Sequence, residues 1–213
     1  MAIAAVGAYV GAQVIADVAS VKIGSVTGRA VDMGTFVYPI TFTLRDVVHK
    51  TLGRRAARTL VITAAAVNLF MASYLQWAAR WPTDPSFALG SEFEAVMAPL
   101  WRITLASIVA EVVSELVDTE VYHWFVRRVT TGHQWARVAL SNAVSVPLDN
   151  VIFAVAAFGA IPGLADHSLT LPWATVWDIF VVNLTVKVVV SAASIPLIYL
   201  APDRTWRTDP RDL

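Results

Sequence analysis

The chain has 213 residues, of which 57% are hydrophobic and only 15% are charged. Soluble globular domains carry about 25% charged residues, so this composition excludes an ordinary water-soluble enzyme. The 16 basic residues balance the 16 acidic ones, which leaves no net charge to attract nucleic acid. The lack of cysteine excludes disulfides, thiolate metal ligands and cysteine nucleophiles. The class that remains is a polytopic membrane protein.

Six apolar segments are candidates for transmembrane helices, because about 20 mostly apolar residues cross a hydrocarbon core of about 30 Å. We therefore expect an all-α bundle of six transmembrane helices in one domain over residues 1–213, with a short polar tail at 202–213. The second segment is the weakest, since Arg45 and Asp46 interrupt it, and a short or broken helix is expected there. The segments are 1–20, 35–48, 57–81, 95–126, 137–161 and 173–201.

Basic residues gather in alternate loops and predict an orientation for the bundle. Lysine and arginine favour the cytoplasmic side of a membrane, so both termini are expected in the cytoplasm. Tryptophans near the segment ends, such as Trp77 and Trp81, are typical of the membrane interface. The basic clusters are Lys50, Arg54, Arg55 and Arg58, then Arg127, Arg128 and Arg137, then Arg204, Arg207 and Arg211.

Ionisable and amide side chains interrupt the apolar segments. A charged side chain in a bilayer core costs about 2.5–3.5 kcal/mol on insertion scales, so each requires an explanation. Those of segment four recur at helical spacing and share one face of the helix. The residues are Glu111, Glu115, Asp118 and Tyr122 in segment four, Asn142, Asp149 and Asn150 in segment five, Asn183 and Lys187 in segment six, and Asn68 and Gln76 in segment three.

Two explanations stay open for any one of these residues, namely structural contacts between helices and a substrate cavity. Lys187 can neutralise Asp118 or Asp149, and Asn68 can form a hydrogen bond between helices. One lysine cannot neutralise four intramembrane carboxylates, so the set as a whole favours a polar cavity. Pro147, two residues before Asp149, is expected to free a backbone carbonyl there.

Small residues form a stripe along the first segment. Their four-residue spacing allows close approach of another helix, which fits internal packing or the docking of a partner subunit. The stripe consists of Ala4, Ala8 and Ala12, interleaved with Gly7 and Gly11.

Several motifs of the chain occur together in one known family. They are GTFVYPITF at 34–42, followed by Asp46, Gly53 and RRAAR at 54–58, then RITLAS at 102–107, the pattern of Ser114, Glu115, Asp118 and His123, residues 145–149, and Lys187. In their order and spacing, from about residue 17 to 199, they resemble the queuosine precursor transporter family, also called the vitamin uptake transporter (VUT) family.

The resemblance implies a six-helix inner-membrane importer of queuosine precursors, the 7-cyano- and 7-aminomethyl-7-deazaguanines used in tRNA modification. It implies a nucleobase-like small molecule and membrane lipid as partners, and neither a cofactor nor a metal ion. Two positions depart from the family pattern, since Lys50 stands where many members have glutamate and Glu115 where many have glutamine.

Given such a substrate, the intramembrane residues acquire candidate roles. Carboxylates accept the N–H donors of the base, amides serve donors and acceptors, and aromatic rings cover its face. Lys187 is expected to hold a carboxylate ionised or to contact the base carbonyl. The candidates are Glu115, Asp118 and Asp149 as acceptors, Asn68, Gln76 and Asn150 as amides, Phe42, Trp77 and Phe153 as stacking groups, and Glu111, Glu115 and Asp118 for ion coupling.

Two alternatives to a stand-alone secondary transporter remain. One is a substrate-capture subunit of an energy-coupling-factor system, because the chain has no phosphate-binding G-x-x-x-x-G-K-[ST] motif of its own and would need an energy-coupling module. The other is an intramembrane enzyme, which is disfavoured because His49, His123, His133 and His167 form no H-E-x-x-H site. A homo-oligomer is left open.

Overall fold

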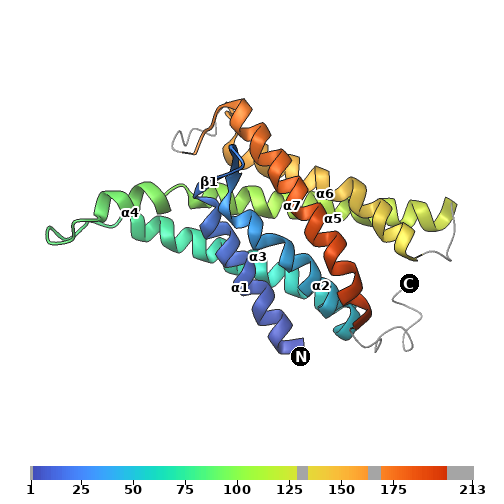
Figure 1. Cartoon of the computed structure of the whole chain (residues 1–213). Helices are drawn as coiled ribbons and strands as arrows, with labels where there is room; N and C mark the ends of the chain where they lie inside the picture. Colours follow the sequence, from blue (N-terminus) through green and yellow to red (C-terminus); the bar gives the residue numbers. More distant parts are fainter. Residues whose placement is uncertain (1, 129–133, 163–168, 201–213) are drawn as a thin grey trace.

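The structure is a computed structural model that describes residues 2–128, 134–162 and 169–200 of the chain. Long helices dominate it, and a two-stranded sheet follows the first of them (Figure 1). The elements in chain order are α1 (Ala2–Ser20), β1 (Ile23–Val26), β2 (Arg29–Asp32), the 3-10 helix η1 (Met33–Phe36), α2 (Tyr38–Leu52), α3 (Arg54–Ala79), α4 (Gly90–Met97), α5 (Leu100–Arg128), α6 (Gln134–Phe158) and α7 (Trp173–Leu200).

All six expected segments coincide with helices, and within the described residues four stretches are long and apolar enough to cross a membrane. The four are Ile3–Ser20, Arg55–Ala79, Gly90–Ser114 and Trp173–Val190. The described apolar part of α6, Ala143–Phe158, is shorter, and α2 has only 15 residues. The expected multi-pass membrane protein is therefore confirmed, whereas the count of six full spans stays a prediction.

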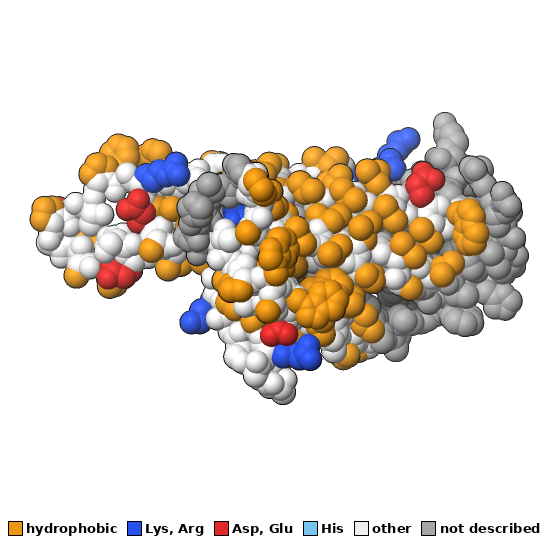
Figure 2. Space-filling model, turned by 90° about the horizontal axis from the view of Figure 1, so that it is seen from above, with side chains coloured by type: hydrophobic (Ala, Val, Ile, Leu, Met, Phe, Trp, Pro, Cys, Tyr) orange, Lys and Arg blue, Asp and Glu red, His pale blue; other side chains and the backbone are white. Residues whose placement is uncertain are grey.

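The outer surface of the bundle is apolar. Hydrophobic side chains cover much of the face shown in Figure 2, and acidic and basic side chains are few on it. Large apolar residues such as Ile62, Phe70 and Leu116 are mostly exposed, which in water would be costly. This surface suits a helix bundle surrounded by lipid, where each helix satisfies its own backbone hydrogen bonds.

Two features differ from the expected segments. The fourth segment is broken into α4 and α5 at Ala98 and Pro99, because proline lacks an N–H donor and disfavours helix at the residue before it. The stretch after α1 forms an antiparallel hairpin, which we did not expect. Its turn residues Thr27 and Gly28 both have positive φ angles, 51° and 83°, as the tightest hairpin turns require.

The helices pack in two groups, one of α1, α2 and α3 and the other of α5, α6 and α7. The groups contact each other where α2 meets α7 and where α5 meets α1 and α3, and β2 of the hairpin contacts α7. Helices α5 and α6 lie side by side, and α7 crosses α6 and contacts α2 and β2 (Figure 1). Helix α1 packs against α2, α3 and α5. One buried apolar cluster, which includes Ile103, Phe158 and Ile179, joins α5, α6 and α7, and a second, which includes Tyr9, Val48 and Leu60, joins α1, α2 and α3.

Arg102 of α5 contacts both the end of α6 and the segment before α7. Its guanidinium is buried, donates to the backbone oxygens of Ala156 (2.9 Å) and Gly159, and also contacts the Thr170 hydroxyl at 3.2 Å. The last carbonyls of a helix have no partner within the helix and carry partial negative charge. Arg102 therefore caps the C-terminal end of α6 and ties it to α5 and to the segment before α7.

Candidate substrate-binding cavity

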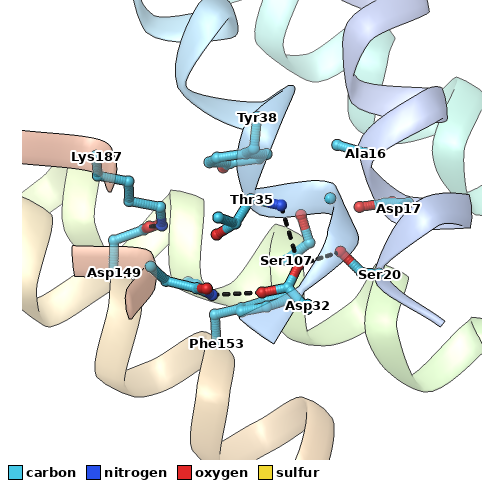
Figure 3. A pocket seen from close by; sticks show the side chains of 13 residues that line it. Ala16, Asp17, Ser20, Asp32, Thr35, Tyr38, Ser107, Asp149, Phe153 and Lys187 are labelled. Atoms are coloured by element: carbon cyan, nitrogen blue, oxygen red, sulfur yellow. Dashed lines mark hydrogen bonds and ion pairs between the residues drawn. The ribbon is translucent and has the colours of Figure 1, made fainter. Parts of the chain in front are cut away.

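A small cavity of about 20 Å³, whose lining includes several polar side chains, lies where the two helix groups meet. Such a volume has room for about one water molecule. Helices α1, α2, α5, α6 and α7 contribute to its wall, together with β2 and η1 (Figure 3). The lining residues are Ala16, Asp17, Ser20, Asp32, Gly34, Thr35, Tyr38, Ser107, Ala110, Asp149, Phe153, Asn183 and Lys187.

A buried ion pair forms one side of the cavity. The Lys187 ammonium, near the middle of α7, pairs with the Asp149 carboxylate of α6, and both side chains are at most 5% exposed. The Lys187 Nζ also lies 5.0 Å from the ring centroid of Tyr38 on α2. Of the two partners considered for Lys187, the structure shows Asp149; the Asp118 side chain lies outside the described residues.

Asp32 ties the hairpin to two helices at the opposite side of the cavity. Its Oδ1 accepts from the Ser20 hydroxyl of α1 (2.7 Å) and from the backbone N–H of Thr35 (3.1 Å), which caps η1. Its Oδ2 accepts from the Asn183 amide of α7. An aspartate three residues before the capped N–H is a usual helix N-cap, so the local sequence explains this geometry.

Gly34 permits the close packing that forms this wall. A Cβ atom at this position would lie 2.2 Å from the Ala16 carbonyl oxygen and 2.1 Å from the Ser20 hydroxyl oxygen. Real Cβ atoms do not approach backbone oxygens so closely, so η1 can rest on α1 only with glycine here. The first residue of the GTFVYPITF motif thus has a packing role beside the cavity.

Two buried oxygen atoms that face the cavity have no hydrogen-bond partner. They are Oδ2 of Asp17, whose side chain points toward the cavity in Figure 3, and Oδ1 of Asn183. Both residues are at most 3% exposed. Burying a polar group without a partner costs about 1–3 kcal/mol, so these acceptors are suited to receive donors from a bound molecule.

A second polar network lies outside the cavity between α1, α3 and α5. The Tyr9 hydroxyl donates to Glu111 at 2.8 Å, and the Gln13 amide lies 3.3 Å from both Glu111 oxygens. The Asn68 amide donates to the Gln13 side-chain oxygen at 3.4 Å. Asn68 thus makes the interhelical hydrogen bond that was one of its two explanations.

The structure brings together three of the site residues expected from the sequence. Asp149, Phe153 and Lys187 all line the cavity. The side chains of Glu115 and Asp118 lie outside the described residues, so their roles stay predictions.

The other candidates lie away from the cavity. Phe42 is one helical turn from Tyr38, with ring centroids 5.5 Å apart. Asn150 is buried and donates to the Phe180 carbonyl at 2.7 Å, which links α6 to α7. Gln76 is on α3. Trp77 is 54% exposed, and its ring makes tilted contacts with Tyr74 and Trp81, with centroids 5.7 Å and 5.0 Å away. Asn68 and Glu111 belong to the network described above.

Sequence analysis missed much of the cavity wall. Most of the missed residues come from the end of α1, the hairpin and η1, and the last two lie before or at the start of the second expected segment. Asp17 carried a usable signal, because it is an ionisable residue in an apolar helix and follows Tyr9 and Gln13 at four-residue spacing. The missed residues are Asp17, Ser20, Asp32, Thr35, Tyr38 and Ser107, whereas Asn183 was among the polar residues noted in segment six but was given no role.

Long apolar helices with an apolar outer surface define a multi-pass membrane protein, and the buried ionisable side chains at the cavity are of the kind that mark substrate pathways in such proteins. Residues 32–201 match the family described as "Putative vitamin uptake transporter", and the chain belongs to this family. The expected vitamin uptake transporter family is thereby confirmed, whereas the queuosine precursor as substrate stays a prediction. The comparisons with curated proteins and with solved structures gave no match.

Proposed function

We propose that the protein is an inner-membrane importer of queuosine precursors, 7-cyano- or 7-aminomethyl-7-deazaguanine, and that it works as a secondary transporter. The substrate comes from the resemblance of the sequence, and the cavity supports it. The observation that carries the proposal is a buried cavity in which unpartnered acceptors of Asp17 and Asn183 lie near the rings of Tyr38 and Phe153.

The chemistry of a deazaguanine fits this lining. The base presents N–H donors along its pyrimidine edge and one carbonyl acceptor beside them. A carboxylate such as Asp149 can accept two of these donors at once, and an aromatic ring can stack on the base. Lys187, already beside Asp149 and Tyr38, is the described donor best placed for the carbonyl.

The charged residues of the cavity favour a positively charged substrate or a cation bound together with the substrate. Its lining holds three carboxylates, Asp17, Asp32 and Asp149, but only one ammonium group, that of Lys187. An unneutralised charge at this depth is costly. Either the aminomethyl precursor supplies a positive charge, or a cation enters with a neutral base.

The cavity must widen before it can take a base. A deazaguanine is far larger than the single water molecule for which the cavity has room, so the helices that line it must move apart. Transporters alternate between openings on the two sides by moving one helix group against the other around a fixed site. The arrangement of two helix groups that meet at this cavity suits such a motion.

The test uses bacteria that lack both queuosine precursor synthesis and their own importer. After the cells are fed either precursor at low concentration, queuosine in tRNA is measured by its retardation in a boronate gel. We expect wild type to restore the shift, and Asp149→Asn/Lys187→Met and Asp118→Asn to abolish it at equal membrane expression. Asp84→Asn, in an exposed loop, is the matched control and should behave as wild type. Failure of wild type with both precursors would refute this substrate.

A partner-driven mechanism is the second candidate. Ala4, Gly7 and Ala8 of the small-residue stripe are exposed on α1, and a side chain at Gly7 or Gly11 would meet nothing within 4 Å, so another helix has room to dock there. This candidate predicts that uptake needs a co-purifying ATPase and is lost in Ala8→Trp. Uptake by the purified chain alone in liposomes would exclude it.

A further inference from the structure

Asp17 is a buried carboxylate with one oxygen left unpartnered at the cavity. Only 3% of the residue is exposed, and its Oδ2 makes no hydrogen bond. The other two carboxylates of the lining are engaged, because Asp149 pairs with Lys187 and Asp32 accepts from Ser20, Thr35 and Asn183. A carboxylate buried in this way is stable only when a positive charge or a proton compensates it.

The groups around Asp17 offer oxygen atoms. The Thr104 and Ser107 hydroxyls of α5 lie beside its carboxyl group. Thr104 is fully buried, and its Oγ1 also has no hydrogen-bond partner. The titratable groups that act on Asp17 from neighbouring elements are Asp32 on β2, Glu111 on α5 and Tyr38 on α2. The unpartnered oxygen of Asp17, among hydroxyl and carboxyl oxygens, makes an environment that favours a hard cation or a proton.

We propose that Asp17 binds the monovalent cation, H⁺ or Na⁺, that drives uptake, and that Thr104 and Ser107 complete its site. The proposal rests on the transport function proposed above and assigns the coupling step to a residue outside the family match at 32–201. The cation site and the substrate site share one cavity. The lining has two more carboxylates than ammonium groups, so a cation at Asp17 would lower the free-energy cost of binding a neutral base. Because coupling between two sites is reciprocal, the bound base would raise the affinity for the cation by the same factor.

The experiment uses the purified chain in liposomes with the neutral cyano precursor. Uptake is measured with an inward Na⁺ gradient at constant pH, and with an inward proton gradient in choline buffer. We expect one of the two gradients to raise wild-type uptake by about tenfold, which is a usual size for coupling between two sites. The gradient that acts identifies the cation. Wild-type uptake that is the same with and without either gradient would overturn the cation site but not the proposed import function. The absence of uptake under every gradient would refute the proposed substrate.

The variants locate the site. Asp17→Asn, reconstituted at the same protein content as wild type, should lose the response to the gradient. Asp84→Asn, a carboxylate in an exposed loop, should keep the full response. An Asp17→Asn protein that accumulates precursor in response to the gradient as wild type does would overturn the proposal.

A second measurement needs no substrate and covers the case in which Asp17→Asn does not fold. The thermal unfolding of wild type and Thr104→Val in detergent is followed against NaCl, with choline chloride for comparison, and against pH. The cation identified in the uptake experiment should raise the melting temperature of wild type. Thr104→Val should need about tenfold more of this cation for the same rise, because one oxygen of the site is lost. An identical dependence in the two proteins would contradict the assignment.

Discussion

The ion pair of Lys187 and Asp149 links α7 to α6 at the cavity. Both side chains are at most 5% exposed and lie near the middle of their helices. A buried pair of this kind is weak support for stability as a whole, because desolvation of both charges offsets their attraction. Removal of one partner is costly, since it leaves the other charge uncompensated. The pair therefore imposes a condition on any substitution at either residue.

We predict that Asp149→Asn lowers the stability of the protein by about 3–5 kcal/mol, because the Lys187 ammonium loses its counter-charge. Tyr38, whose ring centroid is 5.0 Å from the ammonium, offers only partial compensation. The double variant Asp149→Asn/Lys187→Met should regain most of this stability while uptake stays absent. Thermal unfolding in detergent and tRNA queuosine content measure the two effects. A single variant as stable as wild type would show that the pair is not needed in the folded state.

The hairpin and η1 form the segment that joins α1 to the rest of the cavity wall. Its position depends on Gly34, which contacts α1, and on Asp32, which caps η1 and binds Ser20 and Asn183. These contacts fix the hairpin to α1 on one side and to α7 on the other. Because α1 and α7 belong to different helix groups, this segment couples the two groups.

We predict that Gly34→Ala disrupts this segment, since the new methyl group would lie 2.2 Å from the Ala16 carbonyl oxygen. Overpacking of this kind costs about 1–3 kcal/mol, and here the close neighbour is backbone that cannot turn away. Gly11→Ala on α1 is the matched control, because a Cβ there meets nothing within 4 Å. Membrane expression and melting temperature should fall for Gly34→Ala and stay unchanged for Gly11→Ala. Equal behaviour of the two variants would contradict this account of the packing.

The molecule as a whole shows which features the sequence could predict. Long apolar runs form helices because backbone N–H and C=O groups in a bilayer need hydrogen-bond partners within the segment. The positions of the helices and the membrane class were therefore predictable. The pairing of Lys187 with one of two aspartates was also anticipated. The contribution of α1 to the cavity could not be predicted, because helix order in a bundle depends on packing between distant segments. The hairpin was missed because Thr27 and Gly28 lack the Asn-Gly or Asp-Gly signal of its turn.

The orientation of the molecule is a prediction that the natural sequence makes easy to test, because it contains no cysteine. Single cysteines can therefore be placed at exposed positions on either side of α3. Leu52→Cys lies next to the basic cluster at 50–58, and Ser86→Cys lies in the exposed stretch between α3 and α4. Helix α3 has 26 residues, a length of about 39 Å, which is sufficient to separate the two labels across a bilayer.

We predict that a membrane-impermeant maleimide labels Ser86→Cys in intact cells and labels Leu52→Cys only after the membrane is opened. The reason is that Lys50, Arg55 and their neighbours hold the end of α2 and the start of α3 in the cytoplasm, whereas the stretch with Asp84 crosses more readily. Both variants keep every charged residue, so the labels do not alter the charge bias that they report. The reverse pattern would place both termini outside, and labelling of both positions in intact cells would show that the chain inserts in two orientations.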